Sequence, residues 1–222
     1  MKEIIPALLV ESEKEFETKF RAIEKDCSLV QIDVLDGTLF PNTTWFDPVA
    51  IGAIKTSVEI EAHFMVENPI PIIEEFKRLV PTFTRAIVSA EMHRPLGAVV
   101  GHIHDILGLK VGVAINPETP LHEIEEVIHT IDQLTIMGVH PGSQGQTFGD
   151  SQNFSSPDAI FEKIEQARNH RKDLTIEIDG GVTEELIKPL IKAGVQRICI
   201  GSLIFRSENP SDKLKELNKF IL

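Results

Sequence analysis

Three acidic or imidazole side chains stand at the ends of short apolar segments, where they could transfer protons or bind a metal. Asp33 lies in the run QIDVLDG, His63 in EAHFM and Asp179 in EIDGGV. Gln31 and Asp33 share one face of an extended segment, because strand side chains alternate with a period of two. A buried carboxylate is costly unless it has a partner or a function. Carboxylates and imidazoles are common general acids and bases, although the residues alone leave a structural role open for each.

Glycine-rich segments could bind a phosphate through their backbone amides. Gly180 and Gly181 follow Asp179, and Gly201 and Ser202 follow the last apolar segment. Glycine lets backbone amides approach a ligand closely, although ordinary loop glycines would give the same pattern. A third run, GVHPGSQGQTF, contributes the candidates His140, Gly142, Gly145 and Gln146.

The apolar segments themselves have the length and composition of buried β-strands. Most are continuous apolar runs, as expected for a parallel sheet that is covered on both faces. Cys199, inside the last segment, is predicted to be a core residue. The eight candidate strands are residues 3–8, 29–34, 58–63, 85–89, 110–115, 133–139, 175–179 and 197–201.

Amphipathic segments separate these strands, and Gly194 stands where the end of a helix favours glycine. Strands recurring about every 25 residues, with helices between them, predict an α/β fold, a single (β/α)8 TIM barrel domain over residues 1–222. An open, doubly wound sheet is the structural alternative, and the absence of a G-x-G-x-x-G run after the first strand counts slightly against it. The candidate helices are residues 12–25, 71–79, 121–129, 157–170, 183–192 and 211–220.

The composition is that of an ordinary globular protein. Hydrophobic residues make up 42% of the 222 residues, and 34 acidic against 22 basic residues give a formal net charge of -12. Nucleic-acid binding relies on clustered Lys and Arg, so nucleic acid is not an expected partner. Two cysteines are too few for a disulfide framework. No stretch approaches the roughly 20 apolar residues of a membrane helix, and no signal-peptide pattern is present. We therefore expect a soluble, cytoplasmic protein with no membrane partner.

Five short motifs, in order along essentially the whole chain, resemble the ribulose-phosphate 3-epimerase family. The family's H-[IV]-D-[VI]-M-D-G is matched by residues 31–37, and its H-L-M by residues 63–65. Its N-P-x-T-P is matched by residues 116–120, its N-P-G-F-G-G-Q-x-F by residues 140–148 and its D-G-G-V by residues 179–182. Each motif is weak alone, but five in this order on successive strands indicate the family.

The resemblance implies a ribulose-phosphate-binding barrel that interconverts D-ribulose 5-phosphate and D-xylulose 5-phosphate, or a related ketose phosphate, in the pentose phosphate pathway. Asp33 and Asp179 match the catalytic pair, in which one carboxylate removes the C3 proton and the other returns a proton to the opposite face of an enediolate. Their strands are three steps apart in a ring of eight, so the two side chains can face each other. Met65 and the glycine-rich candidates would contact the sugar phosphate. Family members usually form homo-oligomers.

The resemblance also implies one divalent metal ion, Zn, Mn, Fe or Mg, that stabilises the enediolate. Asp33, His63 and Asp179 match three of the four family ligands, and Gln31 stands where the family has His. A glutamine carbonyl oxygen can bind a metal but is a poorer zinc ligand than imidazole. This ligand set would suit Mn, Mg or Fe at least as well as Zn.

Further departures from the family pattern lie at the expected mouth of the barrel. Ala7 replaces a serine, Ser89 a histidine, His140 an asparagine or aspartate, and Ser143 a phenylalanine. Together with Gln31, these changes predict an altered substrate or weakened activity.

Other functions fit parts of the pattern. A hexulose-phosphate epimerase or isomerase with the same two aspartates fits the sequence equally well. A decarboxylase of a related phosphate-binding barrel fits poorly, because no Lys occurs near Asp33 or His63. The non-enzymatic alternative is a catalytically weakened or inactive barrel that binds a phosphorylated ligand. Two buried carboxylates without a function would destabilise such a barrel.

Overall fold

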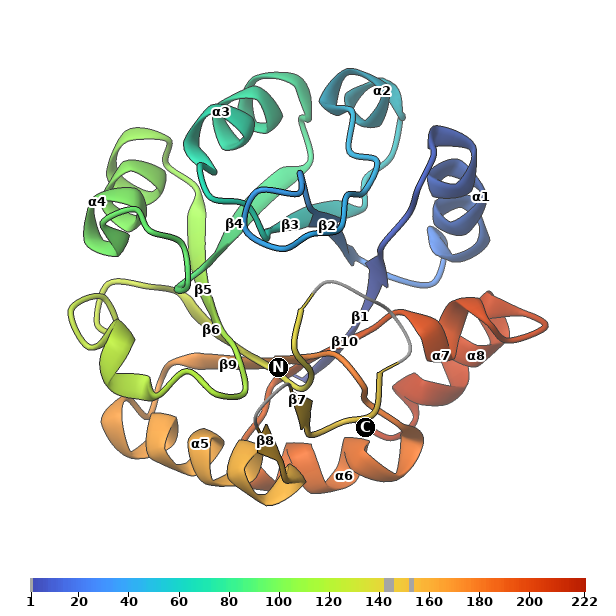
Figure 1. Ribbon diagram of the computed structural model, residues 1–222. Coiled ribbons are helices and arrows are strands. Elements are labelled where there is room, and N and C mark those ends of the chain that lie inside the picture. The colour runs from blue at the N-terminus through green and yellow to red at the C-terminus, as the bar shows by residue number, and fades with distance from the viewer. Residues whose placement is uncertain (1, 142–145, 152–153) are drawn as a thin grey trace.

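Eight parallel strands close into a barrel, and the expected α/β fold is thereby confirmed (Figure 1). The computed structural model describes residues 2–141, 146–151 and 154–222. Around the ring, the strands follow the order β1-β10-β9-β6-β5-β4-β3-β2. Their bounds lie within two residues of the predicted ones. They are β1 Glu3–Leu8, β2 Leu29–Val34, β3 Glu59–Phe64, β4 Phe83–Ser89, β5 Lys110–Ile115, β6 Gln133–Met137, β9 Thr175–Asp179 and β10 Arg197–Ile200.

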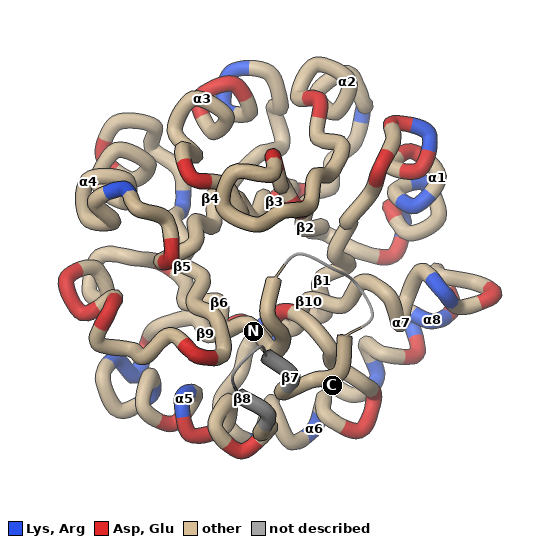
Figure 2. Tube along the Cα trace, in the orientation of Figure 1, with Lys and Arg blue, Asp and Glu red and all other residues tan. Residues whose placement is uncertain are grey.

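Helices surround the barrel on its outside, and most charged residues belong to these helices and their connecting loops (Figures 1 and 2). A two-stranded hairpin of β7 (Asp150–Ser151) and β8 (Phe154–Ser155) precedes α5. The helices are α1 Glu13–Ile23, α2 Pro48–Ala53, α3 Ile70–Leu79, α4 Leu96–Gly101, α5 Pro157–His170, α6 Glu184–Ala193, α7 Ser202–Phe205 and α8 Pro210–Asn218, with a π-helical turn η1 at His102–Ile106 and a 3-10 turn η2 at Leu121–Ile124.

Local sequence signals explain how these helices begin and end. At the start of α1, the Ser12 hydroxyl accepts a hydrogen bond from the backbone nitrogen of Glu15 at 3.3 Å, as an N-cap does. Phe16 and Phe20 of α1 are buried against the barrel. Gly194 ends α6 with a φ of 107°, the left-handed conformation that favours glycine there.

The segment between β5 and β6 differs from the prediction. Residues 121–129 were expected to form a helix, but only η2 is helical and turns follow it. Buried apolar residues lie there at Leu121, Ile124, Val127 and Ile128, a spacing that an α-helix would also give. The backbone instead closes hydrogen bonds over three residues, from Glu123 N to Pro120 O and from Glu125 N to His122 O, both at 3.2 Å. The β-branched side chains of the segment disfavour an α-helix.

The main apolar core lies between the barrel and its helices, whereas the interior of the barrel is polar in several layers. Register places Asp33 beside His63 across β2 and β3, and Asp179 beside Cys199 across β9 and β10. Deeper in the barrel, Arg85 Nη1 donates to Glu61 Oε2 at 2.7 Å. The fold therefore brings polar side chains from distant parts of the sequence into one column.

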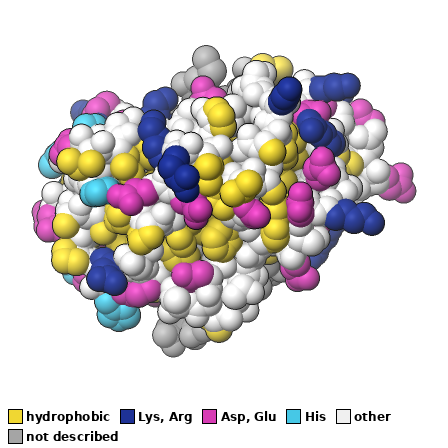
Figure 3. Space-filling model, turned by 90° about the horizontal axis from the view of Figure 1, so that it is seen from above, with side chains coloured by type: hydrophobic (Ala, Val, Ile, Leu, Met, Phe, Trp, Pro, Cys, Tyr) yellow, Lys and Arg dark blue, Asp and Glu magenta, His cyan; other side chains and the backbone are white. Residues whose placement is uncertain are grey.

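The surface is mixed in character. Side chains of both charges are spread over the face seen in Figure 3, with hydrophobic side chains between them. Within the part of the chain that the structure describes, no helix has the length and apolar character needed to cross a membrane.

Candidate active site

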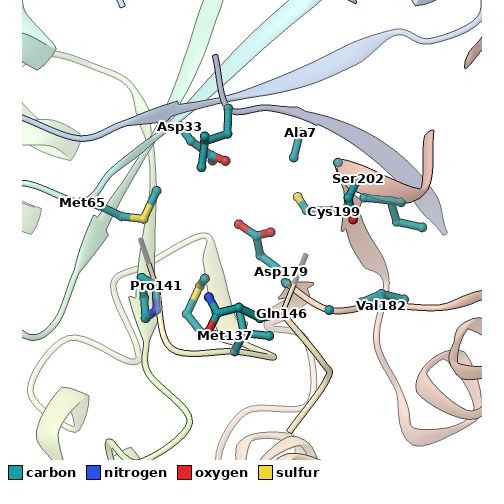
Figure 4. A pocket seen from close by; sticks show the side chains of 16 residues that line it. Ala7, Asp33, Met65, Met137, Pro141, Gln146, Asp179, Val182, Cys199 and Ser202 are labelled. Atoms are coloured by element: carbon teal, nitrogen blue, oxygen red, sulfur yellow. The ribbon is translucent and has the colours of Figure 1, made fainter. Parts of the chain in front are cut away.

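The three candidate acid, base and metal-binding residues converge at the C-terminal ends of their strands. Asp33 of β2, His63 of β3 and Asp179 of β9 are all buried, and each offers one ligand atom within 4.8 Å of the others. Figure 4 shows the Asp33 and Asp179 carboxylates pointing toward each other across a pocket. The three-strand separation predicted between them is present in the ring, where β1 and β10 lie between β2 and β9.

The pocket has an apolar wall and a glycine-rich wall. Met65, which was predicted to contact substrate, lies on the side of Asp33 (Figure 4). The glycine-rich loops that follow β9 and β10 form the opposite side. The pocket is lined by Ala7, Leu9, Asp33, Met65, Met137, Val139, Pro141, Gln146, Asp179, Gly180, Gly181, Val182, Cys199, Ile200, Gly201 and Ser202.

The electrostatics of the site favour one protonated carboxyl group. Burial, followed by the nearby charge of Asp179, raises the pKa of Asp33 to about 7. At neutral pH Asp33 therefore holds a proton for a substantial part of the time. Burial opposes a charged His63, but its interaction with Asp179 outweighs this effect and raises the pKa of His63.

Gln31 lies between the two aspartates. Its Nε2 donates to Asp33 Oδ1 at 2.9 Å and to Asp179 Oδ2 at 2.7 Å. Its Oε1 accepts a hydrogen bond from the thiol of Cys199 at 3.2 Å. In this orientation the amide nitrogen, rather than the oxygen, faces the carboxylates.

The surroundings of His63 are those of a side chain that can bind a metal ion. Among the described residues, neither ring nitrogen of His63 has a hydrogen-bond partner, although the side chain is fully buried. Its Nδ1 lies 3.4 Å from Asp179 Oδ2. Buried polar atoms are nearly always satisfied in folded proteins, so these orphaned nitrogens call for an explanation. Two carboxylates and one imidazole form a ligand set that suits a divalent cation.

Close packing explains why glycine occupies the loop after β9. Gly180 and Gly181 have φ values of 104° and 68°, where other residues are strained. A Cβ at Gly181 would lie 2.6 Å from the backbone nitrogen of Phe148, and one at Gly180 would lie 2.5 Å from Val139 Cγ2. The glycines thus bring the loops after β6 and β9 into contact at the rim of the pocket. This structural requirement is compatible with phosphate binding by the same loop.

His140 belongs to the loop after β6 but is not one of the residues that line the pocket. Its Nδ1 lies 2.8 Å from Glu118 Oε1, and its ring packs edge-on against Phe40. The Gln146 amide donates to the backbone oxygen of His140 at 2.7 Å. Gln146, Gly201 and Ser202, which were predicted to bind the substrate or its phosphate, line the pocket. Gly142, Ser143 and Gly145 lie outside the described residues.

Cys199 is one of the pocket residues that the sequence reasoning missed. It is 2% exposed, as predicted for a core residue, yet its sulfur faces the pocket (Figure 4). Its pairing with Asp179 across β9 and β10 reveals this position once the register of the strands is known. The sequence alone offered no signal beyond the polar residues of neighbouring strands.

Comparison with known proteins identifies similar chains over almost the full length. The model of the Ribulose-phosphate 3 epimerase family matches residues 3–205. The ribulose-phosphate 3-epimerase of Bacillus subtilis (strain 168) is 29% identical, with 98% of each chain covered. The corresponding protein of Chlamydia muridarum is 33% identical, with 87% of this chain and 83% of that protein covered.

Solved structures share the fold at low sequence identity. A structure of KGPDC from Streptococcus mutans has a TM-score of 0.75 and 12% identity, covering 98% of this chain and 96% of that one. The 3-hexulose-6-phosphate synthase from Salmonella typhimurium has a TM-score of 0.71 and 16% identity, covering 100% and 98%. These structures show that the barrel fold of this chain occurs in other solved proteins.

Proposed function

The chain belongs to the ribulose-phosphate 3-epimerase family, and from this premise we propose that it is an isomerase that interconverts D-ribulose 5-phosphate and D-xylulose 5-phosphate. The observation that carries the proposal is the opposed pair of buried carboxylates, Asp33 and Asp179. Inversion at a carbon beside a ketone needs a base on one face and an acid on the other. A pair of this kind meets that need.

In this mechanism the two aspartates exchange roles with the direction of reaction. When Asp179 removes the C3 proton, Asp33 delivers its proton to the opposite face. When the reverse reaction occurs, Asp33 removes the proton and Asp179 delivers one. The raised pKa of Asp33, about 7, suits both roles near neutral pH, because the protonated and ionised forms are both populated.

The phosphate would lie at the glycine-rich wall of the pocket. Gly180, Gly181, Gly201 and Ser202 line this wall together with Gln146, and the backbone N–H groups of the first four would hold the phosphate. Backbone N–H groups can hold a phosphate without a basic side chain. This arrangement agrees with the strongly acidic composition of the chain.

A divalent metal ion would be held by Asp33, His63 and Asp179. When bound, it would supply electrostatic stabilisation of the negative charge that develops on the substrate oxygens. Among the described residues the ring nitrogens of His63 make no hydrogen bond, and this, together with the donor set of the three side chains, supports this role.

Product formation tests the proposal. The purified protein is incubated with D-ribulose 5-phosphate and one added divalent metal, and D-xylulose 5-phosphate is followed by carbon NMR. We expect the two sugars to approach equilibrium. Failure with every metal, while phosphorylated sugars still bind, would support the binding-only barrel, which the relatives do not favour.

Two finer proposals accompany this function: that the protein acts in the cytoplasm and that it forms a homo-oligomer. The similarity to the family supports both. Light scattering after size-exclusion chromatography tests the second, and a mass equal to one chain would contradict it.

A further inference from the structure

One buried residue stands between the catalytic pair and the deeper interior of the barrel. Gln31 of β2 is 0% exposed and is not one of the residues that line the pocket. It contacts Asp33 and Asp179 on one side and Cys199 on the other. Gln31 can therefore affect the reaction only through these three neighbouring residues.

Chemistry dictates how the Gln31 amide is turned. The Gln31 NH2 group has two protons, and it donates one to Asp33 Oδ1 and one to Asp179 Oδ2. In the reverse orientation the amide oxygen would face both carboxyl groups, and at least one of them is ionised and can only accept hydrogen bonds. That orientation would also direct the NH2 group at sulfur, which is a weak acceptor.

Cys199 holds the other end of the amide. The Cys199 thiol is buried and donates a hydrogen bond to Gln31 Oε1 at 3.2 Å. The amide oxygen is thus already engaged, on the side that faces away from the aspartates.

We propose that Gln31 is a positioning residue and not a metal ligand: clamped by Cys199, it holds both aspartates through its NH2 group and leaves a three-residue metal site of Asp33, His63 and Asp179. This inference rests on the metal site of the proposed function. A site with three protein ligands leaves more coordination positions for water and substrate oxygens than a four-residue site. Compared with a site that has a second imidazole, this three-residue site also binds hard cations in greater preference to zinc.

The side-chain amide signals of Gln31 test this orientation directly. In 15N-labelled protein, comparison with Gln31→Leu assigns the two amide protons, and Zn2+ is then added to saturation. We expect both protons to exchange slowly with solvent and to stay hydrogen-bonded in the zinc-bound protein. Cys199→Ser should preserve this protection, and Cys199→Ala should speed exchange by about tenfold, since an unanchored amide opens more often.

Metal affinity provides the second readout. His63→Leu should weaken Zn2+ binding by at least about 100-fold, because it removes a ligand, whereas Gln31→Leu should change it by no more than about tenfold. Gln133→Leu is the matched control, because Gln133 is equally buried in β6 and bonds Thr135 and Arg197 instead of the aspartates. We expect no effect of this control on Zn2+ affinity.

The kinetic constants kcat and KM distinguish a positioning role of Gln31 from direct contact with the substrate. Gln31→Leu should lower kcat by about 10- to 100-fold with KM nearly unchanged, because the residue orients the acid and base without touching the substrate.

A loss of Zn2+ affinity in Gln31→Leu as large as in His63→Leu would overturn the proposal. So would release of the protected amide protons on zinc binding, or a wild-type protein that binds no Zn2+. A protein that shows the expected amide and zinc behaviour but forms no xylulose 5-phosphate would instead refute the proposed function.

Discussion

Asp33 and Asp179 approach the pocket from strands that are three places apart in the barrel, and the amide nitrogen of Gln31 donates to both, at 2.9 Å and 2.7 Å. The two carboxylates are thereby joined through a neutral donor. This link lets them remain close while one of them keeps a proton.

The side chain of Asp179 should be indispensable for proton transfer. Asp179→Asn keeps the size and the hydrogen-bond acceptor for Gln31 but removes the base, so epimerisation should fall by about 10²- to 10⁴-fold. Binding of a sugar phosphate, measured by calorimetry, should persist. Asp173→Asn, on an exposed side chain, is the control and should retain full activity. Undiminished turnover in Asp179→Asn would remove this residue from the acid–base pair.

The raised pKa of Asp33 should appear in the pH dependence of stability. The folded, metal-free protein retains a proton on Asp33 up to about pH 7, whereas the unfolded chain loses it near pH 4. Its free energy of unfolding should therefore fall as the pH rises from 4 to 7. Asp33→Asn lacks this titration and should be more stable than the wild type above pH 7, by on the order of 2–4 kcal/mol. Urea denaturation with a chelator measures the difference, and parallel pH curves for the two proteins would contradict the assignment.

Lys163 of α5 should stabilise the loop that follows β5. Its Nζ donates to the backbone oxygens of Asn116, Pro117 and Thr119, at 2.9, 2.7 and 2.6 Å. Lys163→Met would leave buried carbonyl groups unpaired and should cost about 3 kcal/mol in urea denaturation. Lys192→Met, on the exposed side of α6, should stay within about 0.5 kcal/mol of the wild type. Equal effects of the two substitutions would show that the carbonyl contacts do not matter.

Gly181 should be required by close packing as well as by its backbone conformation. Gly108 has a similar φ, 62° against 68°, but a Cβ there would meet nothing within 4 Å. Gly108→Ala therefore measures the conformational strain alone, about 1 kcal/mol. Gly181→Ala should cost at least about 2 kcal/mol more, because its Cβ would collide with Phe148. It should also raise KM for the sugar phosphate, and identical losses in the two variants would contradict this account.

The positions of the main site residues could be predicted from the sequence, because side chains alternate along a strand and the strands of the barrel follow one another in a regular order. The alternation of side chains places Gln31 and Asp33 on one face of β2, and the order of eight strands places Asp179 across from them. The family motifs add the roles of these residues. The same rules placed most strand ends within a residue or two.

Other features depend on contacts that only the closed barrel provides. The orientation of the Gln31 amide is set by Asp179 and Cys199, which are 148 and 168 residues away in the sequence. Cys199 looked like an ordinary core residue because its strand is apolar. The 3-10 turn at Leu121–Ile124 was taken for a helix because its buried residues also fit a helical face.

The most direct test of the central claim is exchange of the C3 proton of D-ribulose 5-phosphate in D2O, followed by proton NMR with and without Zn2+, Mn2+ or Mg2+. The account predicts loss of the C3 proton signal with the wild-type protein and a metal, and no comparable loss with Asp179→Asn. A C3 signal that persists with the wild type under every metal would contradict proton transfer by Asp33 and Asp179 on this substrate.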